Sequence, residues 1–92
     1  MSCATDLKKR LKTKRVQMGA LAYRNKLDKL PETAARIVFR LEAGDTLWDV
    51  IDAIAWERYH FGVGTTLLQS EIRAAQLEVY HHIHRIRAAF TM

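Results

Sequence analysis

The stretch that decides the fold is TAARIVFRLEAGDTLWDVIDAIAW, residues 33–56. Apolar residues recur there at spacings of three and four, over residues 34–43 and again over 47–57, so each segment predicts a helix with one apolar stripe. Gly44 stands between them, where a helix end favours a residue that tolerates a left-handed backbone. Thr46 then begins a Thr-x-x-Asp capping signature that opens the second helix. The stretch therefore predicts two short helices that meet at a tight corner.

The N-terminal segment predicts a further helix over residues 6–30. Its apolar residues form two partial stripes, and Pro31 ends it because proline disfavours helical geometry in the residue before it. We expect the half from about residue 16 to be packed. Residues 1–15 are expected to be a basic arm that is exposed, frayed or ordered only by a partner.

The C-terminal segment, residues 66–90, predicts the longest helix. One apolar stripe continues for six turns, and Thr66 with Gln69 forms a capping pair at its start. The chain as a whole predicts an all-α fold. We expect a single domain over residues 1–92, a compact bundle of about four helices that includes the long C-terminal one.

Length and composition favour the same class. Ninety-two residues suffice for one domain with a modest core, and a single proline with four glycines favours helices over a turn-rich β fold. An alternative interpretation treats 36–41 and 46–51 as two strands, but neither run alternates with a period of two. The only cysteine, Cys3, cannot form an internal disulfide, and no apolar run approaches the roughly 18–20 residues of a membrane span. We expect a soluble, cytoplasmic protein without a membrane segment.

The net charge of +5 is unevenly distributed. Residues 1–30 carry nine Lys and Arg against two Asp, a balance of +7, whereas residues 31–60 come to −3 and residues 61–92 to +1. A polyanion should therefore meet the N-terminal third first. The block KKRLKTKR, residues 8–15, suits phosphate contacts; the alternative is a solvated face, because the block holds no aromatic for stacking on bases. The candidate phosphate-binding residues are Lys8, Lys9, Arg10, Lys12, Lys14 and Arg15.

The predicted corner resembles the Leu-Glu-Ala-Gly start of many helix-turn-helix domains, here residues 41–44. In one register residues 34–43 and 47–58 form the motif, and its second helix presents Trp48 with three carboxylates that phosphates would repel. In the other register the last two predicted helices form it. Polar side chains early in the C-terminal helix then suit a DNA groove, although the connection exceeds the usual three or four residues and a solvated polar face is the alternative. These candidate residues are Thr66, Gln69 and Arg73.

Aromatic residues gather in the run WERYHF, residues 56–61, next to two glycines. Trp, Tyr and Arg are common in interface hot spots, so the run is a candidate surface for a protein partner or a homodimer contact. The alternative is that Trp56 and Phe61 close the end of the core, which we expect for Trp56. Trp48, off its helix's main stripe, is the best candidate for an exposed anchor. The candidate interface residues are Trp48, Tyr59 and His60.

The signatures of metal sites and catalysis are weak or missing. His81 and His84 would share one helix face while His82 points away, and no acid or cysteine lies close enough in sequence to complete a metal site. Neither a zinc-protease motif, a Gly-rich phosphate loop nor a nucleophile elbow occurs. We therefore expect no metal, no cofactor and no enzymatic activity. The sequence favours a small nucleic-acid-binding regulator or accessory protein for DNA or RNA, with a protein-interaction module such as an inhibitor or adaptor as the alternative.

Overall fold

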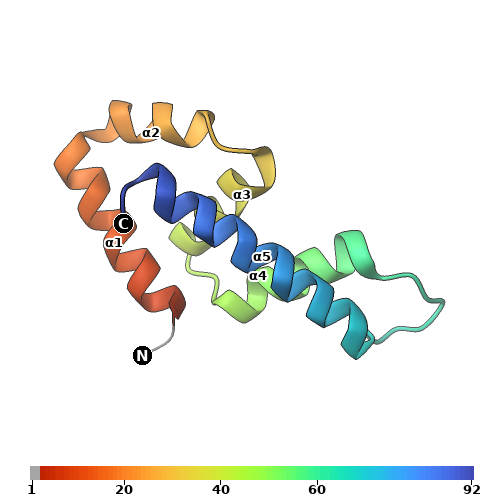
Figure 1. The fold of residues 1–92 in the computed structure, drawn as a ribbon. Helices are drawn as coiled ribbons and strands as arrows, with labels where there is room; N and C mark the ends of the chain where they lie inside the picture. Colours follow the sequence, from red (N-terminus) through yellow and green to blue (C-terminus); the bar gives the residue numbers. More distant parts are fainter. Residues whose placement is uncertain (1–2) are drawn as a thin grey trace.

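The helical prediction is confirmed. The computed structural model describes residues 3–92, with side chains from residue 6, and these residues form helices and connecting turns without a strand (Figure 1). None of the described helices has both the length and the apolar character needed to cross a bilayer. The helices are α1 (Cys3–Met18), α2 (Ala20–Asp28), α3 (Glu32–Glu42), α4 (Leu47–Ile54), a π-helical turn η1 (Ala55–Tyr59) and α5 (Gln69–Ala89).

The long helix α5 is the central element. It runs across α3, α4 and η1, and its last turns lie beside α1 and α2 (Figure 1). Its buried side chains are spaced by three or four residues, so one stripe faces the core along the whole helix. This stripe, which was predicted from the sequence, consists of Ala75, Val79, Ile83, Ile86 and Phe90.

The predicted corner between α3 and α4 has the expected local geometry. Gly44 has φ +107°, a left-handed value that any side chain would strain. The Asp49 N–H donates to Thr46 Oγ1 over 3.1 Å, and the Thr46 N–H donates to Asp49 Oδ2 over 2.8 Å, which completes a capping box. The N–H and hydroxyl of Thr46 hold the pKa of Asp49 below its usual value.

The capping box gives a direct test of the corner. Replacing Thr46 by alanine is expected to lower the free energy of unfolding by about 1 kcal/mol, because the Asp49 N–H loses its acceptor. Thr66, the other threonine predicted to cap a helix, has no such contact among the described residues, and Thr66→Ala should change stability by less than about 0.5 kcal/mol. Urea unfolding of the two variants measures the difference, and equal losses would contradict the capping role.

The first predicted helix is divided in two at Gly19, so residues 3–92 contain five α-helices and the π-helical turn where about four helices were expected. Gly19 has φ +88° and ends the continuous run of residues 6–30. Leu7 and Leu11 are buried on α1, and Tyr23 and Leu27 are buried on α2. In one straight helix the two pairs would face roughly 160° apart at 100° per residue. The break lets both pairs face the same core.

The packing of α1 differs from the sequence-based expectation. The half before residue 16 was expected to be exposed, yet Leu7 and Leu11 are almost completely buried, whereas Val16 is 78% exposed. Asp6 extends this contact, since its carboxylate lies 3.9 Å from the Arg87 guanidinium of α5. The basic block is therefore carried by a helix that packs on the body of the protein.

The connection between η1 and α5, residues 60–68, is held by the buried carboxylate of Glu71. Glu71 accepts hydrogen bonds from the Leu68 N–H over 2.7 Å and the Phe61 N–H over 2.6 Å. His60 Nδ1 lies 3.4 Å from the same carboxylate. The predicted pair of Thr66 and Gln69 does not cap α5, because the helix begins at Gln69 and Glu71 bonds the backbone before it instead.

Candidate functional site

The cations of α1 are positioned by the packing of that helix. With Leu7 and Leu11 against the core, residues spaced by four and three along one flank face outward together. Lys8, Lys12 and Arg15 have this spacing, and we call them the basic row. They line a hollow of about 350 Å³ whose opposite wall is Leu41 and Glu42 at the end of α3.

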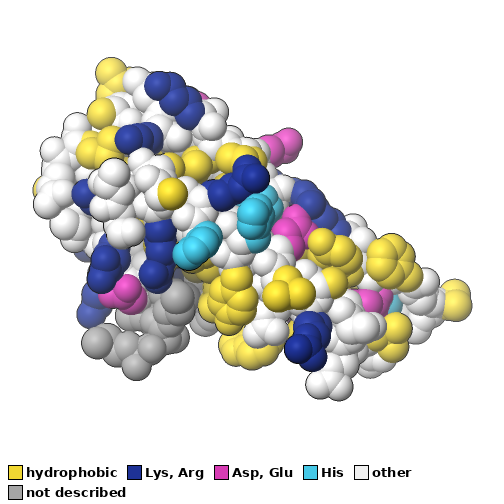
Figure 2. Space-filling model, in the orientation of Figure 1, with side chains coloured by type: hydrophobic (Ala, Val, Ile, Leu, Met, Phe, Trp, Pro, Cys, Tyr) yellow, Lys and Arg dark blue, Asp and Glu magenta, His cyan; other side chains and the backbone are white. Residues whose placement is uncertain are grey.

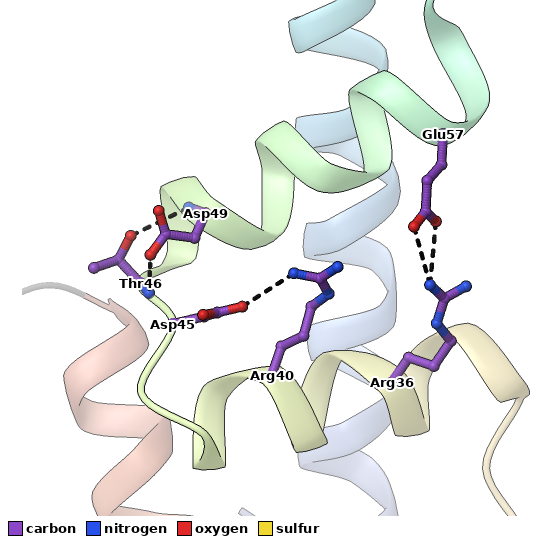
Figure 3. A network of polar contacts seen from close by, with 6 residues as sticks. All are labelled: Arg36, Arg40, Asp45, Thr46, Asp49 and Glu57. Carbon is purple, nitrogen blue, oxygen red and sulfur yellow. Dashed lines mark hydrogen bonds and ion pairs between the residues drawn. The ribbon is translucent and has the colours of Figure 1, made fainter.

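Acidic side chains of the body do not neutralise the basic row. Several acids of the body pair with cations outside α1: the Arg36 Nη2 donates to Glu57 over 3.0 and 3.3 Å, and Arg40 pairs with Asp45 over 3.1 Å (Figure 3). Arg58 pairs with Glu78 of α5. Asp49 is directed at the Thr46 backbone in the same view. Within the described residues, the only cation of residues 8–15 in an ion pair is Arg10, at 3.1 Å from Asp6.

One acid does share the hollow with the basic row. Glu42 accepts a hydrogen bond from the buried hydroxyl of Tyr23. Burial and this bond to a carboxylate both raise the pKa of Tyr23, while the positive charge of Arg15 opposes the rise. The three cations thus face one carboxylate that is already bonded to a phenol, and the hollow carries an excess of positive charge.

The remaining cations of the block cover the other side of α1. Lys9, Arg10 and Lys14 line a second hollow of about 340 Å³ with Thr91 and Met92. Dark-blue side chains gather over α1, with an acid among them (Figure 2). Both flanks of the helix are therefore basic, and the exposed side of α1 presents positive charge to a partner from several directions.

The candidate groove-reading residues lie elsewhere. Thr66 is in the exposed connection before α5, Gln69 is the first residue of α5, and Arg73 follows one turn later. Gln69 and Arg73 line a surface groove with Trp48 of α4. Gln69 and Arg73 therefore lie beside Trp48, a predicted interface residue, and not beside the basic row. Sequence spacing could not indicate this grouping.

The other aromatic candidates have partners within the chain or lie outside the core. The Tyr59 hydroxyl donates to Glu78 Oε2 over 2.6 Å, a bond that raises the pKa of Tyr59. His60 Nε2 lies 2.9 Å from the Gly64 carbonyl oxygen. Contrary to the expectation for Trp56, neither Trp56 nor Phe61 closes the core: Trp56 is exposed beside the His60 ring, and Phe61 is 82% exposed.

Two of the three histidines near the end of α5, His81 and His82, have protein partners. The Arg85 Nε donates to His81 Nε2 over 3.1 Å. His82 Nε2 lies 3.6 Å from Glu78, and burial lowers the pKa of His82. In the part of the chain that the structure describes, no three His, Cys, Asp or Glu side chains are grouped so that they could hold a metal ion.

Sequence reasoning found the cations but missed the residues that complete their surroundings. Leu41 was recognised only as part of a stripe, and Glu42 only as part of the corner, because their approach to α1 is long-range. The buried Glu71 was also missed, although its position three residues after the residue preceding α5 is a signal for a capping carboxylate.

The fold and the site together define a class: a small all-α protein with a basic helix packed on an internally ion-paired body. Comparisons of the chain with protein-family models, with curated proteins and with solved structures gave no significant match.

Proposed function

We propose that this chain is a small non-enzymatic nucleic-acid-binding protein, a regulator or accessory factor that contacts phosphates through α1. The observation that carries the proposal is the basic row: Lys8, Lys12 and Arg15 line one hollow and have no ion-pair partner among the described side chains. Lysine and arginine on one face of a helix can follow the phosphates of a nucleic-acid backbone and release its counterions. The cations on the other flank of α1 add to the same field.

The experiment is fluorescence anisotropy of a generic DNA duplex, titrated with the protein between about 50 and 200 mM salt. The logarithm of the affinity should fall linearly with the logarithm of the salt concentration. The slope of this line should be about −0.9 for each phosphate contacted. Replacing Lys8, Lys12 and Arg15 together by glutamine should weaken binding to every sequence and make the slope shallower by about 3, since each cation contributes about 1.

A matched variant separates the basic row from total charge. Arg24 and Lys26 of α2, and Lys29 directly after it, also lie in the first third and line none of the hollows around α1. Their replacement by glutamine removes the same number of charges. The α2 variant should keep a salt slope close to that of the unmodified protein. Equal losses in the two triple variants, or no binding at the lowest salt, would contradict the proposal.

A second candidate function is a protein-interaction module that docks an acidic partner on the same helix. Glu42 favours this second function, because it places a negative charge in the hollow beside the three cations. A peptide with hydrogen-bond donors next to its acidic side chains complements such a surface better than a uniform polyanion does. A glutamate-rich peptide competing with the duplex distinguishes the two functions. Displacement of the duplex at equal charge concentration would favour protein docking.

A further inference from the structure

A groove on the outer side of α5 is separate from the basic helix. It has a volume of about 580 Å³ and is lined by both apolar and polar side chains, including Trp48, Ile72, Arg73, Gln76, Leu77 and Tyr80. The α5 residues of this set form two neighbouring rows, Ile72 with Gln76 and Tyr80, and Arg73 with Leu77, on a flank of the helix beside the stripe that faces the core. Ile72 itself packs partly against the core. Apolar side chains gather below α5 around a dark-blue side chain (Figure 2).

The composition of the groove is that of a protein interface. Trp48 is 65% exposed, Leu77 is 66% exposed and Tyr80 is 44% exposed. Aromatic residues and arginine are enriched in protein interfaces, whereas lysine and glutamate are depleted, and neither lysine nor glutamate lines this groove. Exposed apolar side chains gathered in one groove are typical of a docking surface.

Charges of both signs border the groove. Arg73 lines it, while Asp49 and Asp52 line an adjoining hollow that shares Trp48 and Ile72 with it. Asp49 is committed to the α4 cap, but Arg73 and Asp52 have no ion-pair partner among the described residues. The surface therefore offers one free cation and one free anion beside the same tryptophan.

We propose that this groove is a homodimer interface, in which α5 of one copy packs against α5 of a second copy related by a two-fold axis. In such an isologous contact both copies use the same surface. If one residue of the first copy touches a different residue of the second copy, the same two residues also touch with the copies exchanged, so each pairing occurs twice. Arg73 of each copy then meets Asp52 of the other, and Trp48, Leu77 and Tyr80 are covered. A surface with both signs of charge complements itself, whereas a nucleic acid would meet the repulsion of Asp49 and Asp52.

The groove is long enough for a helix of a second copy to lie along it. A stable interface buries about 800 Å² on each partner. That is roughly an eighth of the 6158 Å² that the chain exposes. The groove, from Gln69 to Tyr80, extends over about 17 Å of helix at 1.5 Å per residue, and the start of α4 widens it. The inference does not rest on nucleic-acid binding, since α1 takes no part in it.

The test is the mass of the chain in solution without nucleic acid, measured by sedimentation and light scattering up to about 100 µM, because interfaces of this size have dissociation constants from the micromolar range downward. The expected mass is twice the 10.6 kDa of the single chain. Leu77→Glu should give the single-chain mass at every concentration. Leu21→Glu is the matched control, because Leu21 is 75% exposed on α2, outside the groove, and this variant should still dimerise.

A charge exchange tests the orientation of the two copies. Arg73→Glu and Asp52→Arg should each weaken the dimer at least tenfold, and the double variant should recover most of that loss. A single-chain mass for the unmodified protein at all concentrations overturns the dimer. If Leu77→Glu and Leu21→Glu dimerise equally, any self-association uses another surface and the inference is overturned. A double variant that dimerises no better than the single charge variants also overturns it.

Discussion

Leu11→Ala is expected to lower the free energy of unfolding by about 2–5 kcal/mol, a large share of the stability of a chain this short. Leu11 lies in the first half of α1, is 1% exposed and packs with Leu7 against the core. Truncation removes the apolar contact and leaves a cavity that the neighbouring helices close only in part. Chemical unfolding followed by circular dichroism measures the loss.

Val16→Ala is the matched control for Leu11→Ala. Val16 belongs to the same helix but is largely exposed, so this variant should differ from the unmodified protein by less than about 0.5 kcal/mol. A small effect of Leu11→Ala, equal to that of Val16→Ala, would mean that α1 does not pack on the body in solution. The basic row would then have no fixed position, and the proposed phosphate site would lose its geometry.

Glu71→Gln is expected to lower the melting temperature by roughly 5–15 °C. The carboxylate accepts from the N–H groups of Leu68 and Phe61, and a glutamine side chain can accept through its one oxygen only. One N–H donor of the connection is therefore left without its partner. Differential scanning calorimetry measures the change, and Glu32→Gln, at an exposed glutamate, should shift the melting temperature by no more than a few degrees.

The effect of Glu71→Gln should also depend on pH. The Leu68 N–H, followed by the Phe61 N–H and His60, lowers the pKa of Glu71 from its ordinary value of 4.5, against the opposing effect of burial. A carboxyl whose pKa is lower in the folded state stabilises the fold fully above its ordinary pKa and loses this contribution as the pH falls through the folded value. The gap between the unmodified protein and the variant should be constant from pH 7 to about 5 and narrow below that. A gap that does not change with pH would contradict the role of the ionised carboxylate.

The parts of the fold that local chemistry decides could be predicted from the sequence. Gly44 and the pair Thr46 and Asp49 act within a few residues of one another, so the corner between α3 and α4 follows from their identities alone. The core stripe of α5 is equally local, because a spacing of three and four over many turns has one interpretation. These signals do not depend on where the rest of the chain lies.

The parts that long-range contacts decide could not be predicted. Leu7 and Leu11 are too few to indicate from the sequence that α1 is buried. They share a core with Tyr23 and Leu27 only because the chain bends at Gly19 and turns both pairs toward the same side. The block of cations was visible in the sequence, but its division between two flanks of α1 depends on that packing. Glu71 looked like an acid on a solvated helix, because the backbone N–H groups that bury it come from the preceding connection.

The contacts that join α1 and α2 to the last turns of α5 have a consequence for the order in which the protein forms during translation. Asp6 meets Arg87, and the Tyr23 ring lies 5.2 Å from the Phe90 ring, so each pair joins segments separated by most of the sequence. Neither pair can form until residues 87–90 have left the ribosome. We expect the corner and α5 to assemble first and the basic helix to dock last, so the nascent chain exposes its strongest positive charge, beside the RNA-rich ribosome surface, before the fold is closed.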